Sequence, residues 1–141
     1  MALDVYHHVH ERLLAGDLPD LNTATINCVL LDGAHSIDLE NTTLADIDAN
    51  EVSGDGYDAG GQAVNGTTVS RTDGVTELEG TDVLWENSTI TADYAAIYEA
   101  DSGSDYLIGV GEFSETEESS DGDFEVDFTD NVLVEFEANP A

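Results

Sequence analysis

Apolar residues recur at helical spacing over the first sixteen residues of the chain. They are Leu3, Tyr6, Val9 and Leu13. Intervals of three or four residues place such side chains on one face of an amphipathic helix. Gly16 follows, and glycine at this point commonly ends a helix. The pattern predicts an N-terminal α-helix over residues 1–16.

The rest of the chain has the patterns of β-strands. Residues 25–31 are apolar at nearly every position, which is typical of a strand covered on both faces. After residue 51, shorter segments alternate apolar and polar positions and recur about every 8–12 residues with turn signals between them, as in antiparallel sandwiches and barrels. The predicted strands are 63–70, 74–79, 82–85, 89–98, 106–113, 124–128 and 132–137. We therefore expect a mainly β protein, an antiparallel β-sandwich with a short N-terminal helix. Residues 1–141 would form a single domain, with the sandwich built from 25–31 and 63–137.

Finer expectations follow from the same patterns. Strict alternation along 89–98 would place Ala92 and Tyr94 on the same face of that strand. Residues 129–131 would form a hairpin loop between the last two strands. The polar segment 114–123 would be a solvated loop, and residues 41–43 could cap one or two helical turns at 44–47.

The charge of the chain is the strongest feature of its composition. Two arginines, no lysine and 32 aspartates and glutamates give a formal net charge of −30 at pH 7. Such self-repulsion destabilises a compact domain unless salt screens it, and at molar ionic strength the Debye length falls to about 3 Å. A disordered acidic tail is disfavoured because 40% of the residues are apolar. The charge favours a folded protein adapted to near-saturated salt, in a haloarchaeon or a virus of one; an acidic mimic that blocks a nucleic-acid-binding protein is the alternative.

The same composition argues against several other classes of partner. Arg12 and Arg71 are the only lysine or arginine residues, so direct binding to nucleic acid or to anionic membranes is not expected, and each arginine should pair with a neighbouring acid. No signal peptide or long apolar run is visible, which predicts a chain made in the cytoplasm. Cys28 lies in an apolar segment and is expected to be a buried side chain rather than a catalytic thiol.

Few residues suggest chemistry. His7 and His10 could share a helix face and bind zinc or nickel, but no committed second pair of ligands is visible, so a plain helix surface is the favoured alternative. Asp46, Asp48 and Asn50 begin like a calcium loop, which then lacks the required glycine. No catalytic motif is present. We expect no enzyme activity and no cofactor, with weakly bound calcium, magnesium or potassium ions as an open alternative.

One segment carries a recognisable motif. Residues 51–61 read Glu-Val-Ser-Gly-Asp-Gly-Tyr-Asp-Ala-Gly-Gly, and the strand segments 83–85, 89–98 and 107–113 follow. In this motif and in its order of elements the chain resembles a family of small virion proteins encoded in the structural-gene modules of tailed phages. Asp93 departs from the family, in which a basic residue is expected here. The resemblance implies a virion structural part and, together with the charge, a haloarchaeal tailed virus; it implies no catalytic residues.

These considerations predict a capsid-surface decoration or cementing protein located in the virion. It would be homo-oligomeric and would bind the major capsid protein or tail proteins. A tail or baseplate component is one alternative; a halophilic ligand-binding module, with Trp85 and Tyr106 lining its groove, is another. Predicted partner contacts are Tyr6, Val9 and Leu13 on the helix and Tyr57, Gly60 and Gly61 in the glycine-rich loop. For the helix, the alternative is that its apolar face packs on the sheet of its own chain.

Overall fold

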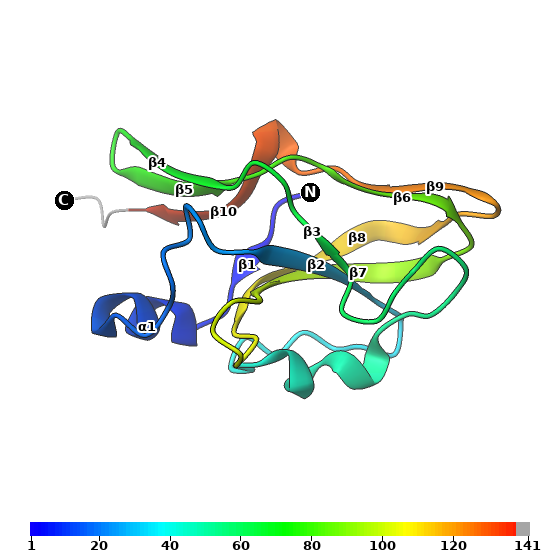
Figure 1. Cartoon of the computed structure of the whole chain (residues 1–141), viewed down its shortest axis with the longest axis horizontal. Helices are drawn as coiled ribbons and strands as arrows, with labels where there is room; N and C mark the ends of the chain where they lie inside the picture. The colour runs from blue at the N-terminus through cyan, green and yellow to red at the C-terminus, as the bar shows by residue number, and fades with distance from the viewer. Residues whose placement is uncertain (138–141) are drawn as a thin grey trace.

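The computed structural model describes residues 1–137 and is mainly β, with antiparallel sheets and one short α-helix, as the sequence predicts (Figure 1). The strands are β1 (Asp4–Val5), β2 (Ile26–Leu31), β3 (Gln62–Ala63), β4 (Thr68–Thr72), β5 (Val75–Glu79), β6 (Val83–Ser88), β7 (Thr91–Glu99), β8 (Leu107–Glu118), β9 (Gly122–Val126) and β10 (Val132–Glu137). The helix is α1 (His8–Ala15), and three 3₁₀ turns are η1 (Leu44–Asp46), η2 (Asp48–Asn50) and η3 (Thr129–Asn131). Within residues 1–137, no helix has the length and apolar composition of a membrane span.

The inner sheet has five strands in the order β1-β8-β7-β2-β3, with every neighbouring pair antiparallel. β2 lies between β7 and β3 and is buried on both faces. Cys28 and Leu30 belong to the apolar cluster on one side of the sheet, and Val29 and Leu31 belong to the cluster on the other. The prediction of a covered strand at this position is confirmed.

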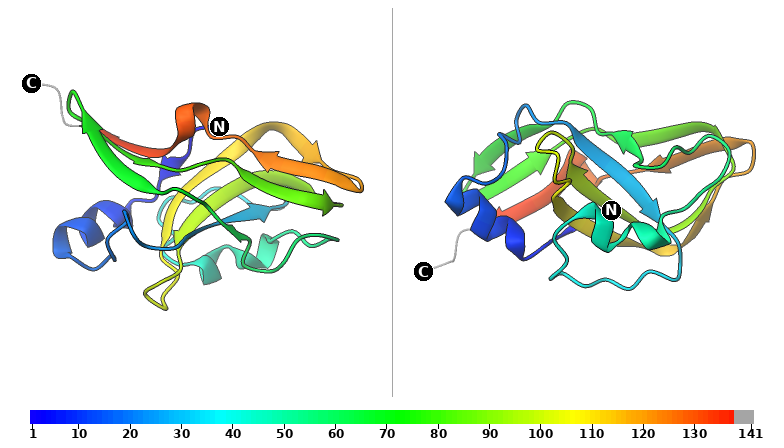
Figure 2. Two further views of the ribbon diagram at one scale, coloured as in Figure 1. Left: turned by 45° about the horizontal axis from the view of Figure 1, so that its top comes forward. Right: turned by 60° about the horizontal axis from the view of Figure 1, so that its bottom comes forward.

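The outer layer of the sandwich is built mainly from two chain segments, which form two separate antiparallel ladders with each other. β6 pairs with β9, and the continuations of the same segments, β5 and β10, pair with each other; β4 adds a third strand beside β5. We call residues 75–88 and 122–137 the outer ribbon (Figure 2). At the break between its two ladders, the Gly80 amide donates a hydrogen bond to the Asn131 carbonyl (2.9 Å), and the Phe128 amide donates one to the Asp82 carboxylate (2.9 Å).

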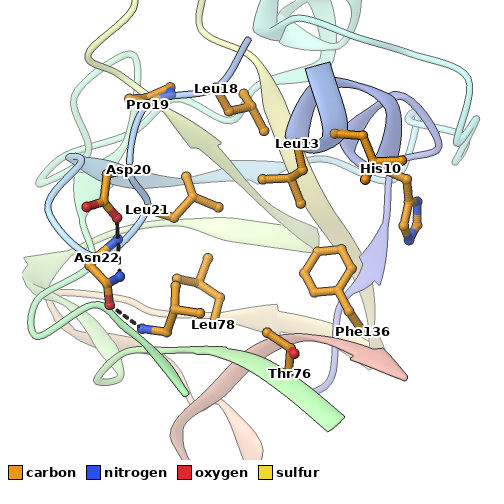
Figure 3. A pocket seen from close by; sticks show the side chains of 12 residues that line it. His10, Leu13, Leu18, Pro19, Asp20, Leu21, Asn22, Thr76, Leu78 and Phe136 are labelled. Atoms are coloured by element: carbon orange, nitrogen blue, oxygen red, sulfur yellow. Dashed lines mark hydrogen bonds between the residues drawn. The ribbon is translucent and has the colours of Figure 1, made fainter. Parts of the chain in front are cut away.

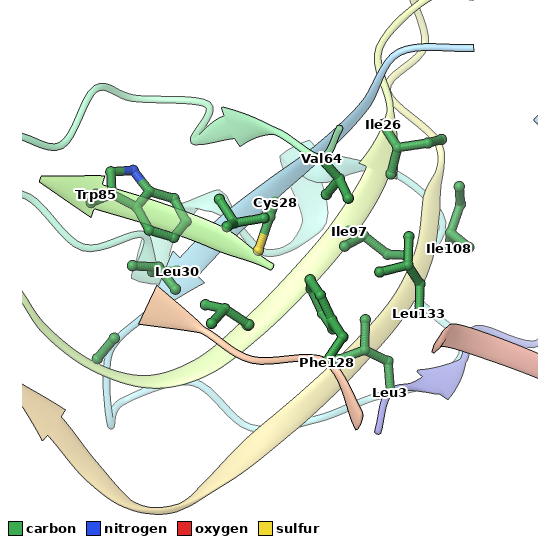
Figure 4. Close-up of a cluster of buried hydrophobic side chains, with 14 of the residues drawn as sticks. Leu3, Ile26, Cys28, Leu30, Val64, Trp85, Ile97, Ile108, Phe128 and Leu133 are labelled. Atoms are coloured by element: carbon green, nitrogen blue, oxygen red, sulfur yellow. The ribbon is translucent and has the colours of Figure 1, made fainter. Parts of the chain in front are cut away.

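The main hydrophobic core fills the space between the inner sheet and the outer ribbon (Figure 4). Fully buried side chains such as Ile26, Ile97 and Phe128 meet there, and burial of each such side chain stabilises the fold by about 1.5–3 kcal/mol. A second cluster lies on the other face of the inner sheet, where α1 and η1 cover it. That cluster includes Val9 of α1 and Ile47 beside η1.

The N-terminus differs from its prediction. The helix begins at His8, because Asp4 and Val5 pair as a short strand with Val110 and Gly109 of β8. Strand pairing therefore overrides the helical spacing of the first residues, since the edge of β8 offers backbone partners. The predicted end is confirmed: Gly16 has φ +74° and donates its amide to the last turn of α1.

A β-bulge corrects the predicted faces of β7. Ala92 pairs with Glu117 of β8, and Tyr94 pairs with Glu112, so the register shifts between the two β7 residues. Ala92 consequently packs in the main core, and Tyr94 packs on the opposite side of the sheet. The expectation that both share one face was wrong because a bulge interrupts the two-residue period.

Two predicted loops are also corrected. Much of segment 114–123 is strand, because β8 continues to Glu118 and β9 begins at Gly122; its side chains are mostly exposed, but its backbone can pair without apolar side chains. Residues 129–131 do not form a hairpin, since β9 pairs with β6 and β10 pairs with β5. They form η3, with Asp130 and Asn131 at positive φ, at the break in the outer ribbon.

The helical turn predicted after residues 41–43 is confirmed. Thr43 is the N-cap of η1, and the Asp46 carboxylate accepts hydrogen bonds from the amides of Thr42 (2.9 Å) and Thr43 (3.1 Å). These amides favour the charged carboxylate and hold the pKa of Asp46 below its usual value. The turn secures the segment that covers the far face of the inner sheet.

Candidate functional site

The glycine-rich motif is attached to its own sheet by hydrogen bonds. The Tyr57 hydroxyl donates to the Glu51 carboxylate (2.6 Å) and accepts from the Leu30 amide (3.1 Å) of β2. The Gly60 amide donates to the same carboxylate (2.8 Å), and the Tyr98 hydroxyl of β7 donates to the Gly60 carbonyl (2.7 Å). Burial, and then the hydrogen bond to Glu51, raise the pKa of Tyr57 and keep its hydroxyl protonated as a donor.

Two glycines of the motif lie where no side chain fits. A Cβ on Gly61 would lie 1.9 Å from the Cys28 carbonyl oxygen, and a Cβ on Gly54 would lie 2.1 Å from the Thr89 carbonyl oxygen. Both residues have a positive φ within the range that favours glycine. Here the backbone of the motif runs against the backbone of β2 and of the segment before β7. We call residues 51–61 the clamp.

The clamp places three of the predicted partner contacts inside the molecule. Tyr57 is buried, with its ring 5.7 Å from that of Trp85. Gly60 and Gly61 are half-buried, and their backbones contact Tyr98 and β2. The motif thus explains how residues 51–61 close the edge of the inner sheet through β3, and it leaves the aromatic ring of Tyr57 unavailable to a partner.

The three partner contacts predicted on the helix differ in their exposure to solvent. Tyr6 and Val9 are fully buried against the far face of the inner sheet. This corrects the expectation for these two residues and agrees with the alternative, in which the helix packs on its own sheet. Leu13 is 42% exposed and faces a groove on the surface.

An apolar groove of about 590 Å³ lies between α1 and the outer ribbon (Figure 3). Its lining comes from α1, the segment after it, β4, β5 and β10. The lining residues are His10, Leu13, Leu14, Leu18, Pro19, Asp20, Leu21, Asn22, Val69, Thr76, Leu78 and Phe136. Asp20 alone among the twelve is acidic, although 32 of the 141 residues of the chain are acids. The groove therefore stands out from the acidic surface around it.

Local interactions hold the two walls of the groove in place. Gly16 ends α1, and the chain turns back so that the Asn22 amide donates to the Asp20 carboxylate (3.0 Å). The Asn22 side-chain oxygen then accepts a hydrogen bond from the Val69 amide of β4 (2.7 Å). On the other side, the His10 ring meets the Phe136 ring edge-on at 5.3 Å.

Apolar side chains at the groove face solvent. Within residues 1–137, four large apolar side chains are exposed, and three of them, Leu13, Leu14 and Val69, line the groove. Leu14 is 92% exposed. Single exposed leucines are ordinary, but here three exposed apolar side chains gather at one groove, which makes this surface the candidate site.

One arginine lies at this surface. Arg71 of β4 pairs across the ladder with Thr76, and Val69 pairs with Leu78. Directly opposed residues share a face of the sheet, and Val69, Thr76 and Leu78 all line the groove. Arg71 is therefore on the groove face; it is exposed and, within residues 1–137, makes no ion pair.

Comparisons with family models, curated proteins and solved structures found no match to this chain.

The other candidate residues have internal partners. His7 pairs with Glu40, and a ring nitrogen of His8 lies 2.8 Å from the Leu107 carbonyl oxygen. Arg12 donates to His8 (2.9 Å) and stacks on the Tyr106 ring at 4.0 Å, so the predicted pairing of this arginine with an acid is not found. Burial lowers the pKa of His8. In the part of the chain that the structure describes, no three metal-ligating side chains gather to hold an ion.

The aromatic residues proposed for a ligand groove are also occupied. Trp85 is 2% exposed and lies between Tyr57 and Phe124 in the main core. Tyr106 is half-buried beneath Arg12. Trp85 therefore cannot line a surface groove for a ligand.

The sequence predicted one residue of the apolar groove, Leu13, as a partner contact; it indicated His10 only as a possible metal ligand, and it gave no role to the other lining residues. The groove combines two segments near the N-terminus with strands from the middle and end of the chain, which no local pattern joins. One sequence signal could have indicated the groove. Leu14 lies outside the apolar spacing of the predicted helix, so packing of the helix against its own sheet does not explain a leucine at this position.

Proposed function

We propose that this chain is a structural subunit of a haloarchaeal tailed-virus particle, a decoration or cementing protein on the capsid surface. The observation that carries the proposal is the apolar groove with exposed Leu13, Leu14 and Val69 on a chain of net charge −30. Such a surface is suited to being covered by another protein subunit. Many copies repeated on a symmetric shell would add modest contacts into firm attachment.

The distribution of charge supports work at high salt. All 32 acidic residues lie within residues 1–137, and in that range only Glu99 is buried; its carboxylate accepts hydrogen bonds from the amides of Asp101 (3.1 Å), Ser102 (2.9 Å) and Tyr106 (3.2 Å). The other acids are exposed or partly exposed, and two arginines cannot neutralise them. We therefore expect the body to stay compact where molar salt screens its charge.

The resemblance of residues 51–61 to tailed-phage virion proteins gives the proposal its particular setting. In this chain the motif closes the sheet rather than forming a contact, so the resemblance speaks for the fold of the subunit. The groove then supplies the contact surface. A tail or baseplate position would use the same groove, and the ligand-binding alternative loses its aromatic platform because Trp85 is buried.

Immunogold electron microscopy of purified virions in high-salt buffer tests the proposal. An antibody against this chain should label the heads. Label confined to the tail would replace the capsid position with the tail or baseplate alternative, and virions without label would contradict a virion surface role. Free antigen added in excess should abolish the label, as the control.

A salt titration tests the halophilic part. We expect the purified chain to be folded in molar KCl and to unfold on dialysis into dilute buffer at neutral pH, because unscreened carboxylates repel one another. Fluorescence of Trp85, the single tryptophan, and circular dichroism would follow the loss. Full stability in dilute buffer would contradict adaptation to high salt.

A further inference from the structure

We propose that the occupant of the groove is a second copy of this chain, bound so that Leu14 of each copy enters the groove of the other. This inference rests on the proposed function in one respect, because it takes the groove as a protein-binding surface. It names the partner, which the proposed function leaves open.

The first support is the shape of the surface. Leu14 projects from the last turn of α1, 92% exposed, and it belongs to the rim of the groove itself. A protruding side chain and a cavity therefore lie side by side on one face. A two-fold contact needs such a self-complementary patch, whereas an open head-to-tail chain needs the two features on separate faces.

The second support is the arrangement of charge. Glu11 precedes Leu14 by three residues and so lies on the same side of α1. Arg71 lies on the groove face of β4 and, within residues 1–137, makes no ion pair. When Leu14 enters the groove of the partner, the carboxylate of Glu11 approaches the face on which the partner exposes its own copy of Arg71.

The third support is the salt regime. Two bodies of net charge −30 repel one another unless the charge is screened. At molar salt the Debye length is about 3 Å, so the repulsion falls away and the apolar contact remains. The groove has a single acidic lining residue, Asp20, so little local repulsion opposes an apolar contact there.

The mass of the purified chain in molar KCl, measured by size-exclusion chromatography with light scattering, is the first test. We expect twice the 15.0 kDa of one chain. Leu14→Glu should weaken dimerisation by at least about 100-fold, because two copies of Leu14 contribute to each dimer and each is worth about tenfold or more. Ile37→Glu is the matched control, since Ile37 is, among residues 1–137, the one exposed large apolar residue outside the groove; the dimer of this variant should persist.

Circular dichroism must show that both variants remain folded. A monomeric wild-type chain overturns the inference and leaves the groove to a different protein. A dimer that survives Leu14→Glu, or one that both variants dissociate equally, overturns it as well.

Cross-linking gives a second measurement that does not depend on loss of binding. A mixture of Leu14→Cys and Val69→Cys chains, treated with a short bis-maleimide, should yield covalent dimers well above those of Val69→Cys alone. Cys28 gives no background, because it is fully buried and burial raises its pKa to about 12. Equal yields from the mixture and from Val69→Cys alone would contradict the proposed contact.

The outcome for the dimer is independent of the outcome for the virion. Labelled heads with a monomeric purified chain would keep the proposed function and remove the second copy as occupant. If the purified chain forms a Leu14-dependent dimer but virions carry no label, the second copy would be kept as the occupant of the groove and the proposed function would be removed.

Discussion

The clamp at residues 51–61 and the apolar groove lie toward opposite ends of the inner sheet (Figure 1), and they differ in how their sequences relate to their surfaces. The clamp has a conspicuous run of glycines, and the polar groups of Glu51, Tyr57 and Gly60 make hydrogen bonds within the molecule. The groove has no motif, yet it exposes Leu13, Leu14 and Val69. The recognisable motif of the clamp therefore reflects a constraint on the backbone inside the molecule. The exposed surface of the groove instead arises from residues without a motif that the fold brings together.

Replacing Gly61 with alanine should have the largest effect on this contrast. Its Cβ would lie 1.9 Å from the Cys28 carbonyl oxygen, so β3 must move away from β2. We expect a loss of about 3–5 kcal/mol in the free energy of unfolding, at the upper end for single substitutions. Urea unfolding in molar KCl, followed by Trp85 fluorescence, measures it.

Gly103→Ala is the matched control for that substitution. Gly103 has φ +83°, similar to the φ of +77° at Gly61, but a Cβ there meets nothing within 4 Å. Its loss should be about 1–2 kcal/mol, the strain of a left-handed alanine alone. Equal losses in the free energy of unfolding for the two variants would show that the close approach of the clamp to β2 does not contribute to the cost of Gly61→Ala.

Removing the Tyr57 hydroxyl should have an intermediate effect. Tyr57→Phe deprives the Glu51 carboxylate of a donor and the Leu30 amide of its acceptor. Leaving such groups unpaired costs about 1–3 kcal/mol of stability, measured by the same urea titration. Tyr106→Phe is the control, because within residues 1–137 the Tyr106 hydroxyl has no hydrogen bond; a loss there as large as at Tyr57 would argue against the clamp.

Changing the rim of the groove should have the smallest effect on stability. Leu14→Glu is expected to alter the free energy of unfolding of the monomer by no more than about 0.5 kcal/mol, as is usual for exposed positions. Leu78 lies in the same groove but is buried, and Leu78→Ala should cost about 2–5 kcal/mol. Thermal unfolding at protein concentrations too low for self-association compares them, and a large loss for Leu14→Glu would mean that Leu14 supports its own fold.

Much of the fold could be predicted because alternation and turn residues are local signals. The positions of β2, β5 and β10 follow from apolar residues and the polar residues around them. Where the prediction failed, a distant partner decided the outcome. Asp4 and Val5 became a strand because β8 lies beside them, and Ala92 changed faces because β8 is longer than β7 at the bulge.

The candidate site could be predicted far less. Tyr57 looked like a surface aromatic because glycines surround it, and its burial depends on Trp85 and Leu30, which come from other strands. The groove forms only where α1, β4 and β10 come together in the tertiary structure, so no local sequence pattern could indicate its lining residues as a set. Charge was the exception, since the net charge of −30 is visible without any fold.

The outer ribbon has a consequence for the order in which the chain folds. Its two arms, residues 75–88 and 122–137, are separated in the chain by β7 and β8, which pair with each other. Closing a shorter loop costs less entropy than closing a longer one. We therefore expect the β7–β8 hairpin to form early and to bring the two arms of the ribbon together, before the more distant β2 joins β7. Substitutions at the pairing of β2 with β7 would then accelerate unfolding far more than they slow folding.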